Sequence, residues 1–219
     1  WSTAGELDSG GNPILKKDDK GRVVYDSKKG DFVLGENVVP EYIWFNGEVT
    51  YTLLGDKVAK GDEPTRINRL GGSAADGKSM IWPVKVFRGK QPYDKATSTL
   101  LIPHTYGPDE GAYWSHFNWE KSLTAGMKAV NEKFSGQYGF VATEMSWPIT
   151  HMVAPKDDAL KCTQCHSPYG RLQKVSGLYM PGRDSNKVLN VLGWTAALLA
   201  LIGVLIHGAL RIRAARKGS

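Results

Sequence analysis

The hydrophobic residues of this chain fall in short runs that are separated by polar residues, glycine and proline. Two of these runs, 42–45 and 49–54, are rich in β-branched and aromatic residues and flank Asn46-Gly47. Asn-Gly between two such runs is a strong indication of a β-hairpin, because both residues tolerate the positive φ of a type I′ turn. We therefore predict a hairpin centred on this dipeptide.

The segment 1–40 is rich in glycine, aspartate and lysine, and only 23–25 and 32–34 have the pattern of short extended pieces. It is either an arm that packs on a partner or a region of solvated loops. Downstream, 81–87 predicts another extended segment. Pro83 within it favours an edge strand or an irregular strand, because proline cannot donate to a sheet ladder.

A third extended run, 98–102, is followed by the aromatic cluster 113–119 and by the one soluble segment with a clear helical period. Asn118 is a suitable N-cap for this helix, and apolar residues recur at helical spacing as far as Phe134, after which Gly136 ends it. Aromatic clusters usually belong to a core, but aromatic side chains also wall large flat apolar ligands.

The longest apolar run is 188–210, a stretch of 23 residues without a charged side chain. At about 1.5 Å per residue, a helix of this length spans about 34 Å, enough to cross a bilayer core. A buried helix of a soluble protein is the alternative. The basic residues that follow place the C-terminus in the cytoplasm and the preceding domain on the other side of the membrane, by the positive-inside rule.

Charge is distributed unevenly along the chain. Its formal net charge is +6, but four of its 28 Lys and Arg residues lie in 211–219, which leaves 24 basic against 22 acidic side chains. A nucleic-acid surface would spread basic and aromatic residues over one face, so we expect no nucleic-acid partner.

The chain begins at Trp1, and the residues near its start do not have the pattern of a secretory signal peptide. Its 25 glycines and 11 prolines are scattered along the sequence. We expect an upstream portion, or a removed leader, before Trp1.

The two cysteines of the chain lie in the pentapeptide Cys162-Thr163-Gln164-Cys165-His166. C-x-x-C-H is the attachment pattern of a c-type haem: the thiols add to the two vinyl groups, and the histidine ligates iron. A zinc site would need a second ligand pair, for which no cysteine remains. A redox dithiol would leave His166 unexplained and would expect a long helix, whereas Pro168 and Gly170 follow. We predict one covalent haem c on Cys162 and Cys165, with His166 as an iron ligand.

The candidates for the second axial ligand are His104, His116, His151 and the five methionines. We rank His151 first, because it lies 15 residues before His166 in an apolar and aromatic segment. A core histidine that is bonded to the backbone is the alternative, and His116 is the second choice. Two histidine ligands would give a low potential, and a methionine such as Met152 would raise it.

Specific strings surround the haem motif. They are Gly-Gln-Tyr-Gly-Phe-Val at 136–141, Thr-Glu-Met at 143–145, Trp-Pro-Ile at 147–149, His-Met-Val-Ala-Pro-Lys at 151–156, Ala-Leu at 159–160, Gly-Arg-Leu at 170–172, and upstream Val-Pro-Glu-Tyr-Ile-Trp-Phe-Asn-Gly at 39–47 and Arg-Gly-Lys-Gln-Pro-Tyr at 88–93. Together they resemble the C-terminal part of the octahaem tetrathionate reductase family of multihaem c-type cytochromes, over most of residues 20–180.

This resemblance implies an extracytoplasmic reductase of sulfur or nitrogen oxyanions, in which closely spaced haems supply electrons to a catalytic haem with a lysine ligand. Family members attach that haem through C-x-x-C-K, which this chain lacks, and it has one haem motif where they have eight. The chain therefore resembles the terminal-haem region, so the substrate site would lie in an upstream portion or a separate subunit. The resemblance also implies that His151 ligates this haem or a neighbouring one.

We therefore expect a mostly irregular multihaem-cytochrome-type fold of the α+β class, with a few short β-hairpins and helices and one C-terminal transmembrane helix. The expected domains are an extracytoplasmic haem-binding domain at 1–187, the transmembrane helix at 188–210 and a cytoplasmic basic tail at 211–219. The expected function is electron transfer through the haem as part of a membrane-anchored multihaem reductase. Oxidoreductase activity would belong to the assembly, and we assign this chain no catalytic residue.

The expected partners are the remaining haem-bearing portion or subunits, and a quinone-linked or cytochrome b partner in the bacterial inner membrane. His207, inside the predicted span, either ligates a b-type haem of such a partner, approaches a quinone or snorkels to the interface. Two other functions are open. One is a stand-alone membrane-anchored monohaem carrier subunit of a respiratory complex, and the other is a structural anchor that recruits a partner.

Overall fold

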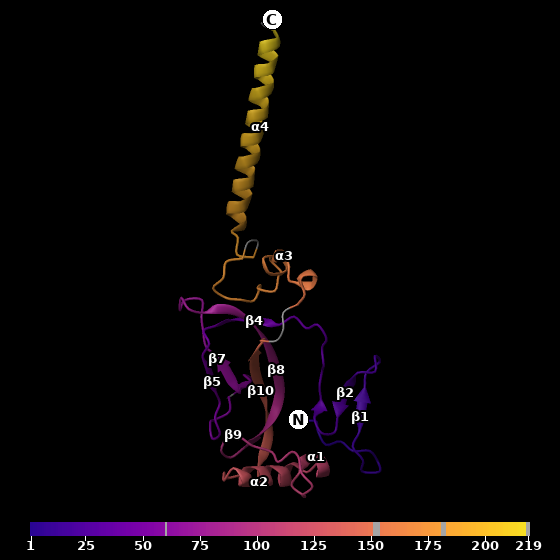
Figure 1. Ribbon diagram of the computed structural model, residues 1–219. Helices are drawn as coiled ribbons and strands as arrows, with labels where there is room; N and C mark the ends of the chain where they lie inside the picture. The colour runs from indigo at the N-terminus through magenta and orange to yellow at the C-terminus, as the bar shows by residue number, and fades with distance from the viewer. Residues whose placement is uncertain (60, 151–153, 181–182, 218–219) are drawn as a thin grey trace. The chain divides into compact units, whose positions relative to one another are not determined.

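The computed structural model describes residues 1–59, 61–150, 154–180 and 183–217. The chain divides into two compact units, Trp1–Met152 and Val153–Ser219. The first unit holds all the described strands and two helices, and the second holds a short 3-10 helix and two further helices (Figure 1). Strands and helices are mostly short and are joined by long irregular segments, which confirms the predicted α+β class with low regular content.

The largest sheet has five strands, in the order β4-β8-β10-β6 with β9 beside β8 (Figure 1). Its members are β4 (Glu41–Phe45), β6 (Thr65–Arg66), β8 (Met80–Asp94), β9 (Thr99–Leu100) and β10 (Tyr138–Pro148). A long antiparallel ladder joins β8 and β10, from Tyr138 opposite Asp94 to Pro148 opposite Val84. A two-stranded sheet, β5 (Val49–Tyr51) with β7 (Asn68–Leu70), lies near β10.

The hairpin predicted around Asn46-Gly47 is wrong. β4 pairs with β8, whereas β5 pairs with β7, so the two flanking runs belong to different sheets. Among the described residues Gly47 has a positive φ, 93°, but Asn46 does not. The side-chain oxygen of Asn46 instead accepts a hydrogen bond from the backbone N–H of Glu48 at 2.9 Å, and the backbone N–H of Asn46 donates to the carbonyl of Gly71. A type I′ turn needs positive φ at both residues, and this side-chain turn replaces it.

Of the two alternatives predicted for the strand around Pro83, an edge strand or an irregular strand, the edge strand is wrong. β8 is 15 residues long and is paired on both sides, with β4 and with β10. The carbonyl of Pro83 accepts a hydrogen bond from Ile149, just beyond the last β8–β10 pair. In an antiparallel strand the N–H and C=O of one residue face the same side. The missing N–H of Pro83 therefore faces the point where the β10 ladder ends, and the sheet loses no ladder bond.

Helix α2 (Trp119–Ala129) begins where predicted and ends earlier. The side chain of Asn118 caps it, accepting a hydrogen bond from the third helical residue at 3.0 Å. The helix does not continue to Phe134 and Gly136, because Asn131 adopts a φ of 57°. The N–H groups of Asn131 and Glu132 return to carbonyls of the last turn at 3.1 and 2.9 Å. This is a Schellman motif with asparagine where glycine is usual.

The aromatic cluster 113–119 forms part of the core of the first unit. Tyr113, at the start of helix α1 (Tyr113–His116), is 1% exposed, and its ring stacks on Trp119 at 3.9 Å between centroids. Trp119 contacts Phe140 of β10 edge to face at 5.3 Å. A buried apolar cluster of Leu101, Leu123 and Met127 packs beside these rings, with Trp119 and Phe134 against it.

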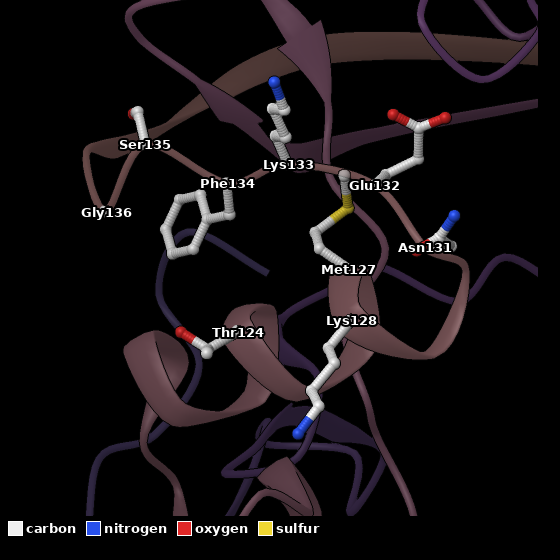
Figure 2. A pocket seen from close by; sticks show the side chains of 9 residues that line it. All are labelled: Thr124, Met127, Lys128, Asn131, Glu132, Lys133, Phe134, Ser135 and Gly136. Carbon is white, nitrogen blue, oxygen red and sulfur yellow. The ribbon is translucent and has the colours of Figure 1, made fainter.

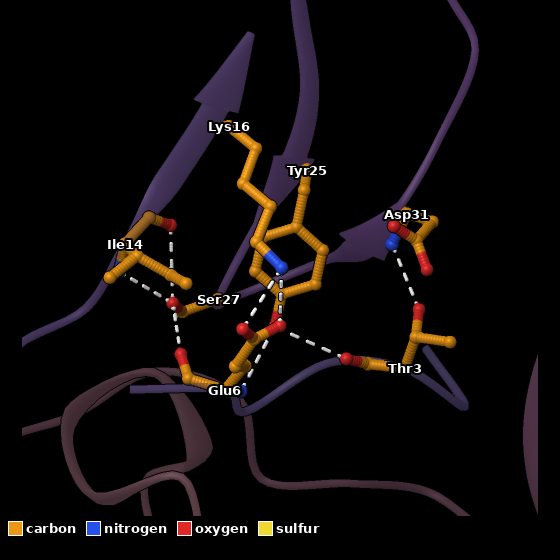
Figure 3. A network of polar contacts seen from close by, with 7 residues as sticks. All are labelled: Thr3, Glu6, Ile14, Lys16, Tyr25, Ser27 and Asp31. Carbon is orange, nitrogen blue, oxygen red and sulfur yellow. Dashed lines mark hydrogen bonds and ion pairs between the residues drawn. The ribbon is translucent and has the colours of Figure 1, made fainter. Parts of the chain in front are cut away.

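The N-terminal segment forms a small sheet in the order β1-β2-β3 (Figure 1). Its strands are β1 (Leu15–Lys17), β2 (Val23–Asp26) and β3 (Gly30–Asp31). Figure 3 shows its buried polar contacts: the Tyr25 hydroxyl accepts a hydrogen bond from the N–H of Glu6, and Ser27 Oγ accepts from Ile14 and donates to the carbonyl of Glu6. The predicted strand at 23–25 is confirmed, whereas 32–34 is not a strand.

Asp94, at the end of β8, is fully buried and accepts hydrogen bonds from three neighbouring residues. Ser135 donates through its N–H at 2.7 Å and its hydroxyl at 2.9 Å, and the N–H groups of Ala96 and Thr97 donate at 2.8 and 3.1 Å. Burial alone would raise the pKa of Asp94, but these hydrogen bonds together outweigh it and hold the pKa below its ordinary value. The ionised carboxylate therefore joins β8 to the turn before β9 and to the segment after α2.

We expect Asp94→Asn to lower the free energy of unfolding by about 2–3 kcal/mol, because an amide cannot accept from all of these buried donors. Guanidinium unfolding followed by tryptophan fluorescence measures this. The folded pKa is the lower one, so the wild-type advantage should be present above the unfolded pKa of about 4 and be lost as pH falls through the folded pKa. Asp62→Asn, at an exposed position, should change stability by less than about 0.5 kcal/mol. Equal stability of the two variants would contradict this role.

Candidate functional site

The predicted haem motif forms one helical turn in the second unit, α3 (Cys162–Cys165). The N–H of Lys161 donates to Gln164 Oε1 at 2.8 Å, and the N–H of Gln164 returns to the carbonyl of Lys161 at 2.9 Å. These two bonds fix the start of the turn. Residues three apart on a helix share a face, so the side chains of Cys162 and Cys165 project from the same side. His166 follows as the C-cap, and its N–H donates to the carbonyl of Cys162 at 2.8 Å.

The thiols and the imidazole of this motif are accessible. Cys162 and His166 are exposed, Cys165 is partly buried, and no disulfide joins the two cysteines. The structure thus presents two thiols from one face of a helical turn, with an imidazole directly after the second. This donor set fits covalent attachment of a haem c, in which the thiols form thioether bonds and the imidazole ligates iron.

A tight turn after α3 holds the motif in place. The N–H of Arg171 donates to the carbonyl of Gln164 at 2.8 Å, and the N–H of Gly170 donates to the carbonyl of Ser167 at 2.9 Å. A Cβ atom at Gly170 would lie 2.7 Å from the carbonyl oxygen of Cys165, closer than real Cβ contacts allow. Glycine is therefore required at this position for the backbone to fold back onto the motif.

Arg183 closes the loop that follows the motif. Its guanidinium donates to the carbonyls of Gln173 at 2.7 Å and Val175 at 3.2 Å, and also to the carbonyl of Leu178. Asp184 accepts from Arg183, and this hydrogen bond is the main cause that lowers the pKa of Asp184. Sequence reasoning missed this loop closure, because an isolated Arg-Asp pair has no periodicity or motif that indicates it.

The same loop buries three apolar side chains. Leu172, Val175 and Met180 are 8%, 3% and 1% exposed, and Asp184 Oδ2 accepts from the N–H of Met180 at 2.8 Å. Among the described residues, these are the buried apolar side chains of the second unit. The described part of the loop between the motif and the long helix is therefore held by buried apolar side chains and its own hydrogen bonds.

Two of the other ligand candidates are the described histidines His104 and His116. His104 Nε2 is 2.8 Å from Asp109 Oδ2, and this hydrogen bond is the main cause that lowers the pKa of Asp109. His116 is exposed at the end of α1. Both belong to the first unit. His151 and Met152 lie outside the described residues, so His151 stays a prediction. Within the described ranges, no three His, Cys, Asp or Glu side chains are grouped so that they could hold a metal ion.

Helix α4 (Lys187–Lys217) contains the predicted membrane segment. It is 31 residues long, no residue of it is buried, and it is long and apolar enough to cross a membrane. Asn186 directly precedes the helix and caps it. Its side chain accepts hydrogen bonds from the N–H groups of Val188 and Leu189 at 3.0 and 3.2 Å. The helix extends beyond 188–210, because the basic residues that follow the apolar stretch are helical too.

A hollow of about 650 Å³ lies where α2 ends (Figure 2). Met127 and Phe134 line it together with polar residues of the turn at Asn131, and the Phe134 ring extends along one side. The hollow arises because the chain reverses direction at the Schellman motif. Cys162, Cys165 and His166 do not line it, so it belongs to the end of the helix and not to the candidate haem motif.

Comparison with known proteins agrees with the haem motif. The family model described as Cytochrome c bacterial matches residues 1–169, a stretch that includes Cys162, Cys165 and His166. Among solved structures, the octaheme cytochrome c from Shewanella oneidensis is similar, with a TM-score of 0.70 and 38% sequence identity. That match covers 83% of this chain and 41% of the Shewanella chain. No curated protein matches. The expected similarity of fold to an octahaem cytochrome is confirmed.

Proposed function

Since the chain belongs to the bacterial cytochrome c family, we propose that it transfers electrons through one haem c attached to Cys162 and Cys165. The observation that carries this proposal is the C-x-x-C-H motif on an accessible helical turn, inside the matched residues. A bound haem c would supply one-electron redox chemistry. The chain would supply the two thioether bonds and the imidazole of His166, and the closed loop after the motif would keep these groups in place.

His151 is our proposed second axial ligand. One observation supports it over the other histidines. It lies in the Trp-Pro-Ile-Thr-His-Met string that resembles multihaem cytochromes. A Met152 ligand would give a higher reduction potential than a second histidine, so a potentiometric titration distinguishes the two. With both axial positions filled, this haem would carry electrons and would not bind substrate.

We further propose that the chain is the terminal-haem part of a membrane-anchored multihaem reductase. The chain spans 41% of the length of the Shewanella octaheme cytochrome c, which supports a larger assembly with further haems. A tetrathionate reductase-like activity on sulfur or nitrogen oxyanions follows from the sequence resemblance. Catalysis would then belong to the rest of the assembly, since this chain has one haem motif, of the C-x-x-C-H type.

The proposed location is the bacterial inner membrane, with α4 as a single span. Arg211, Arg213, Arg216 and Lys217 at the end of α4 support a cytoplasmic C-terminus by the positive-inside rule. The haem motif would then lie on the periplasmic side, where a quinone-linked or cytochrome b partner could exchange electrons with it. His207 would lie near the cytoplasmic end of the span.

The haem content per chain tests this function. We expect the intact cytochrome, purified from membranes, to contain more than one haem per copy of this chain in the pyridine haemochrome assay. The outcome of one haem per chain, with no haem-bearing partner, would support the stand-alone monohaem carrier in its place. If electron transfer from the membrane pool is unchanged after His166 is replaced, the chain acts as a structural anchor that recruits a partner.

A further inference from the structure

The edge of β8 that faces away from β10 is only partly paired. β4 covers its first part, as far as Val84 opposite Glu41, and β9 covers its end at Tyr93 and Asp94. Between them, at 85–89, no described strand pairs with β8 on this side. At about 3.3 Å per residue these five positions correspond to about 17 Å of open edge.

The backbone groups exposed at this edge follow from the strand alternation. The carbonyl of Pro83 faces Ile149 next to β10, whereas the carbonyl of Pro92 faces Leu101 next to β9. N–H and C=O of one residue face the same side, and the side alternates along the strand. Val86 and Arg88 therefore point their N–H and C=O to the open edge. Within the described part of the chain, neither has a backbone partner there.

A groove of about 600 Å³ runs along this open edge. Its apolar wall comes from Val33 and Leu34, which are 93% and 65% exposed, and from Phe87 of β8, which is 66% exposed. At one end, the α-amino nitrogen of Trp1 donates to the carbonyl of Lys90 at 3.3 Å. One polypeptide segment of this chain thus already bonds to the edge, at the position next to Arg88 on the same side of the strand.

Part of the opposite margin of the sheet, around 143–146, is covered. β6 pairs with β10 at Thr143 and Glu144. Farther along, the buried side chain of Asn68 donates to the carbonyl of Ser146 at 2.7 Å and accepts from its N–H at 2.8 Å. A side-chain amide therefore takes the place of a strand there. Unpaired strand edges are usually covered or blunted in native proteins, so the open stretch of β8 indicates a missing covering segment.

We propose that an extended segment of the remaining haem-bearing polypeptide pairs with β8 at Val86 and Arg88 and packs its apolar side chains on Val33, Leu34 and Phe87. This inference rests on the proposed function, because its occupant is the rest of the multihaem cytochrome. One observation favours that occupant. The Shewanella octaheme cytochrome c is more than twice as long as the part that matches this chain. Extended segments add to a sheet edge through backbone bonds and alternate side-chain pockets.

Hydrogen exchange of single amides in the intact cytochrome tests the proposal. Lys85 and Phe87 pair with Trp147 and Met145 of β10, so their amides should exchange slowly in any case. If a segment covers the edge, the amides of Val86 and Arg88 should exchange as slowly as these, about 100-fold slower than unbonded amides. Exchange of Val86 and Arg88 at the rate of unbonded amides would overturn the proposal.

A matched pair of variants tests the apolar wall. Leu34→Glu should accelerate exchange at Val86 and Arg88 at least about 10-fold and leave Lys85 and Phe87 unchanged. Leu53→Glu is the control, because Leu53 is 67% exposed, close to the 65% of Leu34, and does not line the groove. Both leucines are exposed, so neither change removes core packing. If the amides of Val86 and Arg88 exchange at equal rates in the two variants, the apolar wall does not contribute to binding the segment.

The haem count separates this proposal from the proposed function. More than one haem per chain with protected Val86 and Arg88 amides supports both. More than one haem with unprotected amides overturns the edge pairing and leaves the function intact. One haem per chain, with unprotected amides and no haem-bearing partner, overturns both, because the proposed occupant does not then exist.

Discussion

Replacing both Cys162 and Cys165 with serine is expected to abolish covalent haem attachment to this chain. Serine lacks the thiol that forms the thioether bond, while the hydrogen bonds of Lys161 and Gln164 that fix α3 do not involve either cysteine side chain. Haem staining of a denaturing gel should therefore lose the band of this chain completely, with the protein itself still present.

Thr163→Ala is the matched control for this experiment. Thr163 lies in the same helical turn and is exposed, but its side chain has no part in the proposed attachment. This variant should retain the haem-stained band at wild-type intensity. A stained band that persists in the double serine variant at the mass of this chain would show that the haem is held elsewhere, and would contradict the proposed site.

The features that the sequence predicted correctly are local. The predicted extended run at 23–25 forms most of β2 from consecutive residues. Asn118 likewise caps α2 through a bond to a residue three positions away. Such interactions depend on neighbours in sequence, so pattern and spacing are enough to find them.

The predictions that failed concern partners that are distant in sequence. The runs on either side of Asn46-Gly47 form strands, but they do not pair with each other. The first run pairs with β8 and the second with β7. Pro83 suggested an edge strand or an irregular strand. The N–H that proline lacks would face β10 just beyond the last β8–β10 pair, so no hydrogen bond of the ladder is lost. The loop closure by Arg183 is equally non-periodic. His151 remains a prediction, since it lies outside the described residues.

Truncation after Asn186 is expected to release the chain from the membrane. This change removes α4 and leaves the haem motif and its closed loop in place. After alkaline carbonate washing, which removes peripheral proteins, the truncated chain should be found in the soluble fraction with its haem stain retained. Truncation after Leu210 is the control, because it removes the basic tail and keeps the apolar stretch, and this variant should stay with the membrane.

Arginine substitutions in the span allow a graded test of the same anchor. The stretch 188–210 contains 12 Leu, Ile and Val residues, each of which favours insertion by about 0.3–0.6 kcal/mol, for a total of about 4–7 kcal/mol. One central arginine costs about 2.5–3.5 kcal/mol, so Leu199→Arg alone should still insert. Leu199→Arg combined with Ile202→Arg should cost about 5–7 kcal/mol, which offsets the total and should move most of the chain to the soluble fraction. Carbonate-resistant retention of this double variant, or of the chain truncated after Asn186, would show that something other than α4 holds the protein on the membrane.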